Sequence, residues 1–175
     1  MGEGELGKLR EFLPRWDGSL LLVMNMQLGL PIDARHIEFV KREIEKARLR
    51  NSIIVFMENT AIGLPTLSEV LKEASSDASY PGVVRLKHWG ASGFPSLNYF
   101  FSHHQIKAPQ KISICGFSYG RSIQETLSDM KLFRFTDSSH PKIRPTHVYT
   151  ENINEAYRTY ALIPTVELLL HQEEQ

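Results

Sequence analysis

The segment 111–123 carries the residues best placed for chemistry in this sequence. An apolar run of strand character breaks at Gly116, and after a tight turn the chain enters a stretch, 120–130, of helical pattern. In open α/β sheets, ligands bind beyond the carboxyl ends of the strands, where the amides of helix N-termini face them. Ser122 therefore stands where a nucleophile would stand if the site were catalytic.

Two further polar residues directly follow apolar runs of strand character. Asn25 comes after the run 19–24, and Lys87 comes after the run 83–86. Asparagine cannot accept a proton at neutral pH, so Asn25 is no general base. Lys87 is open to three interpretations. It is the base of a Ser–Lys pair if burial keeps it neutral, a cation that binds an anion or a carbonyl group, or a solvated lysine at a strand end.

The elements that would position these residues alternate along the chain. Apolar runs predict strands at 19–24, 52–57, 83–86, 112–115, 132–135 and 161–163. Helical patterns lie at 4–13, 35–50, 64–73, 96–105, 120–130, 151–160 and 165–171, with Asp33 as the N-cap of the second and a loop at 136–145. This alternation predicts a single α/β domain over 1–175, a three-layer α/β/α sandwich around a six-stranded parallel sheet, preceded by an N-terminal extension at 1–17.

Composition limits the classes of function. The 175 residues include 20 basic and 20 acidic side chains, so no net charge favours nucleic acid or an anionic membrane. The apolar runs are too short to cross a bilayer, and the acidic N-terminus does not read as a secretory signal. The single cysteine, Cys115, excludes an internal disulfide and a multi-cysteine zinc site, and it reads as a buried structural thiol. We expect a cytoplasmic protein without metal or cofactor.

Three segments together resemble the isochorismatase-like cysteine hydrolase family, which includes nicotinamidases and related amidases. The segment 20–27 resembles the family's first strand with its Asp-x-Gln pattern. The segment 84–87, followed by Ser92-Gly93-Phe94, is similar to a strand that ends in lysine and a Ser-Ala-Phe loop. The segment 112–123 resembles the strand, glycine turn and nucleophile-bearing helix, and 161–167 is similar to the last strand and helix. The likeness spans about 19–170.

This resemblance implies a Rossmann-like sheet of order 3-2-1-4-5-6 and a site at the ends of strands one, three and four. In the family an aspartate takes the proton of a cysteine, the thiolate attacks an amide, and a lysine holds the pair. The equivalent positions here are Asn25, Lys87 and Ser122, so the base and the thiol are both replaced. Asn25 also removes the aspartate-only route of true isochorismatases. The zinc-binding Asp-x-His cluster of nicotinamidases is missing from 57–64.

Two functions follow from these changes. The first is a pseudoenzyme that keeps the hydrolase fold and binds a small anionic or carbonyl ligand, or a protein partner, most simply as a homo-oligomer. The alternative is a weak or altered amide or ester hydrolase that uses Ser122 with Lys87. Glu58, at the end of the second strand, remains open as a carboxylate that replaces the lost aspartate. The residues expected to line the ligand site are Trp89, Phe94, Phe117, Ser118 and Tyr119.

Overall fold

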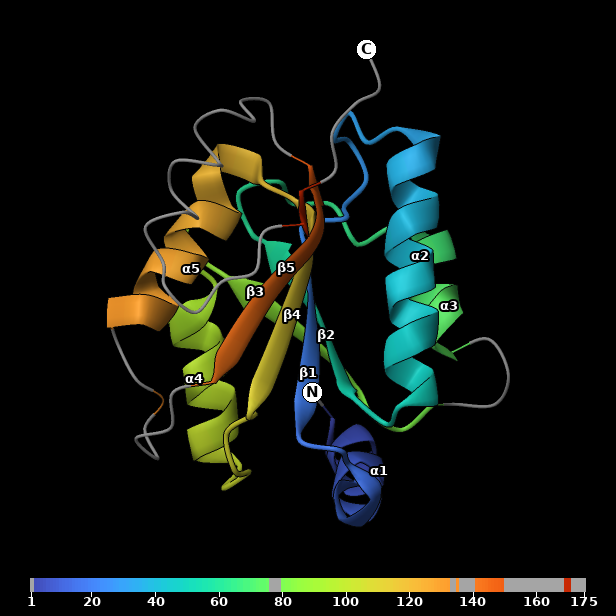
Figure 1. Cartoon of the computed structure of the whole chain (residues 1–175), viewed down its shortest axis with the longest axis vertical. Helices are drawn as coiled ribbons and strands as arrows, with labels where there is room; N and C mark the ends of the chain where they lie inside the picture. Colours follow the sequence, from blue (N-terminus) through green and yellow to red (C-terminus); the bar gives the residue numbers. More distant parts are fainter. Residues whose placement is uncertain (1, 76–79, 133–134, 136–140, 150–168, 171–175) are drawn as a thin grey trace.

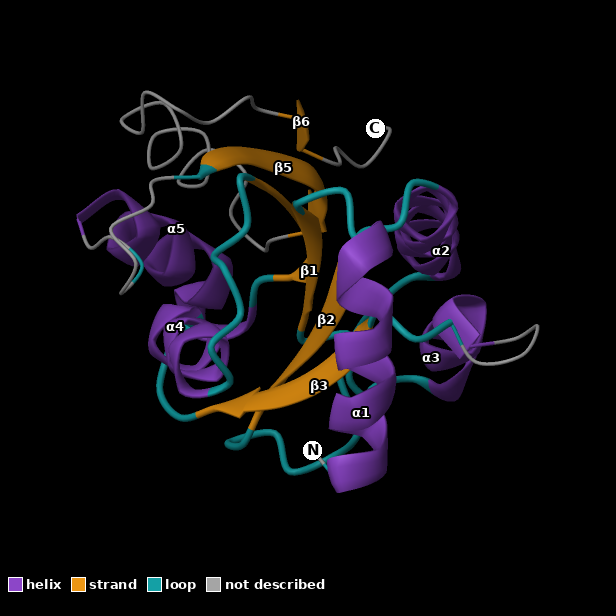
Figure 2. Ribbon diagram, turned by 90° about the horizontal axis from the view of Figure 1, so that it is seen from below, coloured by secondary structure: helices purple, strands orange, loops and turns teal. Residues whose placement is uncertain are grey.

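The structure, a computed structural model, describes residues 2–75, 80–132, 135, 141–149 and 169–170. A central sheet has helices on both faces, α4 and α5 on one and α2 and α3 on the other (Figure 1). Figure 2 shows the same three layers end-on, with the twisted sheet between them. The elements are α1 (Glu3–Phe12), η1 (Leu13–Arg15), β1 (Ser19–Met24), α2 (Ala34–Leu49), β2 (Ile53–Asn59), α3 (Ser68–Ser75), β3 (Val83–His88), α4 (Phe94–His103), β4 (Lys111–Phe117), η2 (Tyr119–Arg121), α5 (Ser122–Leu132), β5 (Lys142–Tyr149) and β6 (Leu169–Leu170).

The body of the sheet consists of four parallel strands in the order β3-β2-β1-β4, as predicted. Every residue of β1 and β2 is buried, which is why both strands read as continuous apolar runs in the sequence. Helices cover both sides of such a sheet, so neither face of these strands needs polar side chains. The predicted α/β class and the order of the first four strands are confirmed.

The rest of the predicted sheet differs from the structure. The predicted fifth strand, 132–135, begins at the last residue of α5. The strand that pairs with β4 is β5, and its first half lies within the predicted loop 136–145. Pro145 argued for a loop, but the β4–β5 pairing shifts register next to it, and proline is tolerated at such irregularities. β6 contains two residues of the predicted closing helix 165–171, whereas the predicted strand 161–163 and helix 151–160 lie outside the described residues.

Two hydrophobic cores fill the spaces between the layers. Alternate residues of each strand point to opposite faces, so Leu20, Leu22 and Met24 join the core under α4 and α5. Leu21 and Val23 join the core under α2. α1 contributes Leu9 and Phe12 to the first of these cores. The two cores fix the sheet, and they therefore fix the loops at its carboxyl edge.

Most predicted helix boundaries agree with the structure to within about two residues, and the start of α3 differs more. Asp33 caps α2 as predicted, because its side chain accepts a hydrogen bond from the backbone N–H of His36 at 2.7 Å. The helix predicted at 64–73 begins at Ser68 instead. Thr66 forms a bridge with Gln27, which keeps the chain extended before the helix. No helix among the described residues is long and apolar enough to cross a membrane.

Candidate functional site

Asn25, the first residue after β1, is the centre of a buried polar network. Its backbone has φ +54°, a left-handed conformation that asparagine tolerates better than most residues. Its side chain is fully buried, and Nδ2 donates to the Phe117 carbonyl at 3.1 Å and to Oγ of Ser122 at 2.5 Å. Because a carbonyl can only accept, the Phe117 contact assigns the NH₂ group to that side and leaves Oδ1 facing away from Ser122.

Ser122 begins α5 and is enclosed on all sides. Its side chain is fully buried, and its backbone N–H donates to the Tyr119 carbonyl. Its own carbonyl accepts from Oγ1 of Thr126 at 2.6 Å, and that hydroxyl in turn accepts from the N–H of Gly93 at 2.8 Å. No titratable group forms a hydrogen bond with Oγ of Ser122 in the part of the chain that the structure describes. Among these residues, therefore, the hydroxyl has no general base.

His88 is the third member of this network, and the sequence analysis assigned it no part in the triad. It ends β3, is fully buried, and places Nε2 3.0 Å from Oδ1 of Asn25. Oδ1 accepts there, so Nε2 carries the hydrogen. Nδ1 lies 3.1 Å from a second acceptor, the carbonyl of Gly90, and a neutral ring that donates through Nε2 has no second hydrogen to give it. Burial lowers the pKa of His88, while the Gly90 carbonyl raises it by a smaller amount, so the ring is neutral at pH 7.

Lys87 does not belong to this buried network. Val84 and Leu86 pack into the core beneath α4, and His88 shares their face, so the intervening Lys87 faces the α2–α3 side of the sheet. Lys87 is exposed and forms no hydrogen bond or ion pair with Asn25 or Ser122 among the described residues. The structure thus brings two of the three predicted positions together and puts an imidazole, not an ammonium group, beside Asn25.

The residues predicted to line a ligand site are dispersed. Phe94 and Phe117 are buried in the two different cores, on opposite faces of the sheet. Ser118 is buried and bonds to the side chain of Gln124 and to the N–H of Ile123. Trp89 and Tyr119 are exposed instead.

Two other predictions concern Cys115 and Glu58, the groups that could replace the missing thiol and the missing carboxylate. Cys115 is fully buried, as expected, and burial raises the pKa of its thiol well above the usual value. Glu58 does not replace the lost aspartate. Its carboxylate accepts from Thr66 and Arg85 on the α2–α3 side of the sheet, away from Ser122. No group of three metal-ligating side chains gathers among the described residues.

The lowered pKa of His88 predicts that the protein loses stability in mild acid. Below about pH 6.5 the unfolded chain takes up a proton on this histidine before the folded chain does. The free energy of unfolding therefore falls as pH drops from about 6.5 toward the lower folded pKa, with a slope of at most about 1.4 kcal/mol per pH unit. Urea unfolding at about pH 7.5 and about pH 5.5 measures it. Other groups titrate here too, so His88→Asn is the control: an equal loss in this variant would contradict the assignment.

The architecture is an α/β fold with helices on both sides of a parallel sheet of order β3-β2-β1-β4, and it resembles the isochorismatase-like fold. No protein-family model and no curated protein matches the sequence. Three solved structures share the fold. The MAR1 ribonuclease of Caenorhabditis elegans superposes with a TM-score of 0.65 at 14% identity, over 86% of this chain and 76% of that one.

The other two neighbours are bacterial YcaC proteins. That of Escherichia coli, described as an octameric hydrolase of unknown specificity, has a TM-score of 0.56 at 12% identity over 89% of this chain and 76% of its own. That of Pseudomonas aeruginosa, solved with hexane-2,5-diol and covalent acrylamide, has a TM-score of 0.60 at 13% identity over 90% of this chain and 78% of its own. At these identities the likeness establishes the fold alone.

Proposed function

We propose that this chain is a member of the isochorismatase-like cysteine hydrolase family that no longer hydrolyses and that acts by binding. The observation that supports this most directly is the hydrogen bond from the amide of Asn25 to Oγ of Ser122. A serine nucleophile needs a neighbour that accepts its proton, and here the neighbour donates one instead.

The remaining contacts support the same conclusion. The N–H of His88 is directed at Asn25, and no lone pair of the ring reaches the serine hydroxyl. The N–H of Ser122, which could stabilise an oxyanion, is already bonded to the Tyr119 carbonyl. All three side chains, Asn25, His88 and Ser122, are fully buried, so a substrate would have to open the network before it met the hydroxyl. In this arrangement the hydrogen bonds of the three residues hold β1, β3 and α5 together.

The alternative, a hydrolase that uses Ser122 with Lys87, is less well supported. A lysine base must be desolvated and within hydrogen-bond reach of the hydroxyl, whereas Lys87 is exposed and faces the other side of the sheet. The C. elegans neighbour makes ribonuclease activity worth testing. Equal numbers of acidic and basic residues provide no excess positive charge for a polyanion, in keeping with a partner other than nucleic acid.

We further propose a cytoplasmic homo-oligomer. The octameric E. coli neighbour supports assembly, and so does Trp89, whose side chain is 75% exposed in the single chain. A large aromatic residue in this position would gain from burial against a second copy.

The test compares the native protein with Ser122→Ala on a panel of amides, esters and RNA. We expect no turnover above background in either, and a difference of less than about twofold between them, because neither the base nor the oxyanion site is available. Lys87→Met tests the alternative in the same assay. Turnover of any substrate that Ser122→Ala abolishes would overturn the proposal, and its loss in Lys87→Met as well would establish the Ser–Lys hydrolase.

A further inference from the structure

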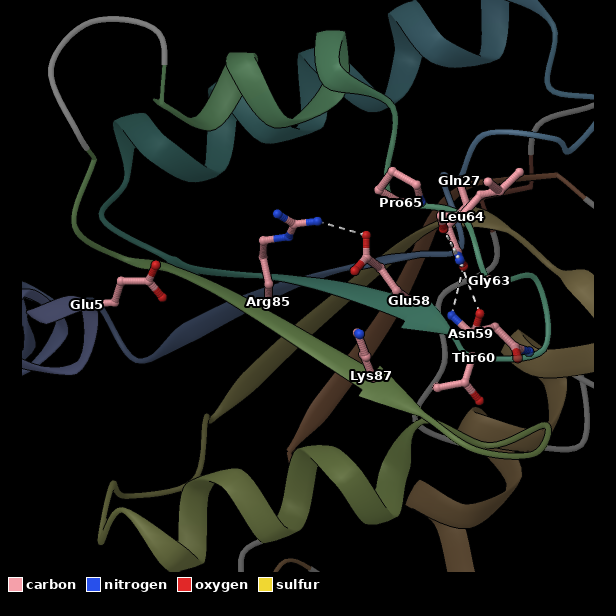
Figure 3. Close-up of a pocket in the computed structure, with 10 residues that line it drawn as sticks. All are labelled: Glu5, Gln27, Glu58, Asn59, Thr60, Gly63, Leu64, Pro65, Arg85 and Lys87. Carbon is pink, nitrogen blue, oxygen red and sulfur yellow. Dashed lines mark hydrogen bonds and ion pairs between the residues drawn. The ribbon is translucent and has the colours of Figure 1, made fainter. Parts of the chain in front are cut away.

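A cavity of about 530 Å³ opens on the α2–α3 side of the sheet, away from the buried Asn25 network. Figure 3 shows its polar wall, formed by the ends of β2 and β3, and its rim, formed by the loop that leads to α3. Arg85, Lys87 and Glu58 extend into it from adjacent strands, and Leu64 and Pro65 supply apolar surface opposite them. No pattern in the sequence indicates this cavity, although Lys87 is one of the residues predicted to bind an anion.

The wall of the cavity is held in place before any ligand arrives. Nε2 of Gln27 donates to the carbonyls of Leu64 at 2.7 Å and Asn59 at 3.1 Å, and Oε1 of Gln27 accepts from the N–H of Asn59 at 2.7 Å. The N–H of Leu28 also donates to the Pro65 carbonyl at 2.9 Å. These bonds join the loops after β1 and β2, so the backbone of this wall loses little further entropy when a small molecule binds.

Only some of the charged atoms in the wall have hydrogen-bond or ion-pair partners. Oε2 of Glu58 accepts from the N–H and hydroxyl of Thr66 and, at 3.0 Å, from Arg85, whereas Oε1 accepts no hydrogen bond among the described residues. Burial raises the pKa of Glu58, but the hydrogen bonds from Thr66 and Arg85 and the charge of Arg85 together lower it below its usual value, so the carboxylate is ionised at pH 7. Lys87 is paired in the sheet with Glu58 but has no hydrogen-bond or ion-pair partner in the described part of the chain. Glu5 of α1 also lines the cavity, so two cations and two anions leave no net charge, and Lys87 is the cation that has no partner among the described residues.

We propose that this cavity binds a small monocarboxylate that carries an O–H or N–H donor on the carbon next to its carboxylate, such as a 2-hydroxy or 2-amino acid. Lys87 holds the carboxylate, with Arg85 beside it on the same strand, and Oε1 of Glu58 accepts the hydrogen of the adjacent donor. The inference deepens the ligand-binding part of the proposed function and moves the ligand away from Ser122. It does not depend on whether Ser122 is active.

The experiment titrates the full chain with L-lactate, propionate and lactamide and follows amide chemical shifts by NMR. Lactate offers the carboxylate and the hydroxyl, propionate lacks the hydroxyl, and lactamide lacks the charge. We expect saturable shifts with lactate at Thr60 and Gly63 on the rim, weaker binding of propionate by about threefold, and no saturation with lactamide. Lys87→Met keeps the length of the side chain and removes the charge, so lactate binding should weaken by at least about tenfold.

The matched control is Lys111→Met, because Lys111 is an exposed strand lysine at the start of β4, away from the cavity. It should bind lactate as the native protein does. Absence of saturation with lactate in the native protein, or equal binding by Lys87→Met and Lys111→Met, would overturn this inference. Shifts centred on Gly90 and Ser122 in place of the rim would overturn it too. None of these outcomes bears on the turnover assay, so the two proposals fail separately.

Discussion

Gly116→Ala is expected to destabilise the protein by more than about 4 kcal/mol, which is close to the whole stability of a domain at the low end of the usual range of about 5–15 kcal/mol. Gly116 has φ +122°, and a Cβ at this position would lie 2.1 Å from the carbonyl oxygen and 2.8 Å from the nitrogen of Met24. Both contacts are with backbone atoms of β1, which pairs with β4 at this point of the sheet. The clash can be relieved only by separating the two central strands. Urea unfolding, or the yield of soluble protein, measures the effect.

Gly7→Ala is the control for this substitution. Gly7 lies within α1, and a Cβ there meets no neighbouring atom within 4 Å outside the helix backbone. Alanine should stabilise the helix by about 0.5–1 kcal/mol, since it has fewer backbone conformations to lose than glycine. A folded Gly116→Ala variant with the unfolding midpoint of the native protein would show that β1 and β4 are not held as closely as the structure has them.

Asn25→Ala is expected to cost about 3–7 kcal/mol. The substitution removes the acceptor that Nε2 of His88 uses and the donor that Ser122 uses, in a place that water does not reach. Each buried polar group that loses its partner costs about 1–3 kcal/mol. Alanine also tolerates the left-handed backbone of position 25 less well than asparagine, which adds about 1 kcal/mol. Chemical unfolding of the two proteins measures the difference.

Asn51→Ala separates backbone strain from the loss of hydrogen bonds. Asn51 has φ +61°, close to the φ +54° of Asn25, but its side chain is exposed at the end of α2. This variant should lose only about 1 kcal/mol. Equal losses in the two variants would mean that the buried network contributes nothing, and the structural role assigned to Asn25 would be wrong.

The sequence predicted the strands that are buried on both faces and failed where the sheet is irregular. β1 and β2 are apolar throughout because helices cover both of their sides, and such runs are easily recognised. β5 has Lys142, Arg144 and Pro145 in its first half, so it carries neither an apolar run nor a clean alternation. Its place is decided by pairing with β4, an interaction with a distant segment that a local pattern does not contain.

The triad-equivalent positions were predicted in part. Asn25 and Ser122 lie together because they follow β1 and β4, which are neighbours in the sheet. Lys87 was chosen because the resemblance places a lysine at this strand end. The alternation of β3 carried a contrary signal: Val84 and Leu86 are its core-facing residues, so the residue two places further on, His88, faces the same way. The fixed hydrogen-bond directions of the network, by contrast, could be read only from coordinates.

β3 is the outermost strand on its side of the sheet and is paired with β2 alone. Whether an ammonium or an imidazole meets Asn25 therefore depends on a single ladder of hydrogen bonds. Sliding that ladder by one residue would bring Lys87 to the place of His88 and Leu86 to the place of Lys87, so a formal charge would lie against Asn25 and an apolar side chain would face the cavity. A small insertion or deletion between α3 and β3 could therefore change the group beside Asn25 from a neutral imidazole to a charged ammonium group.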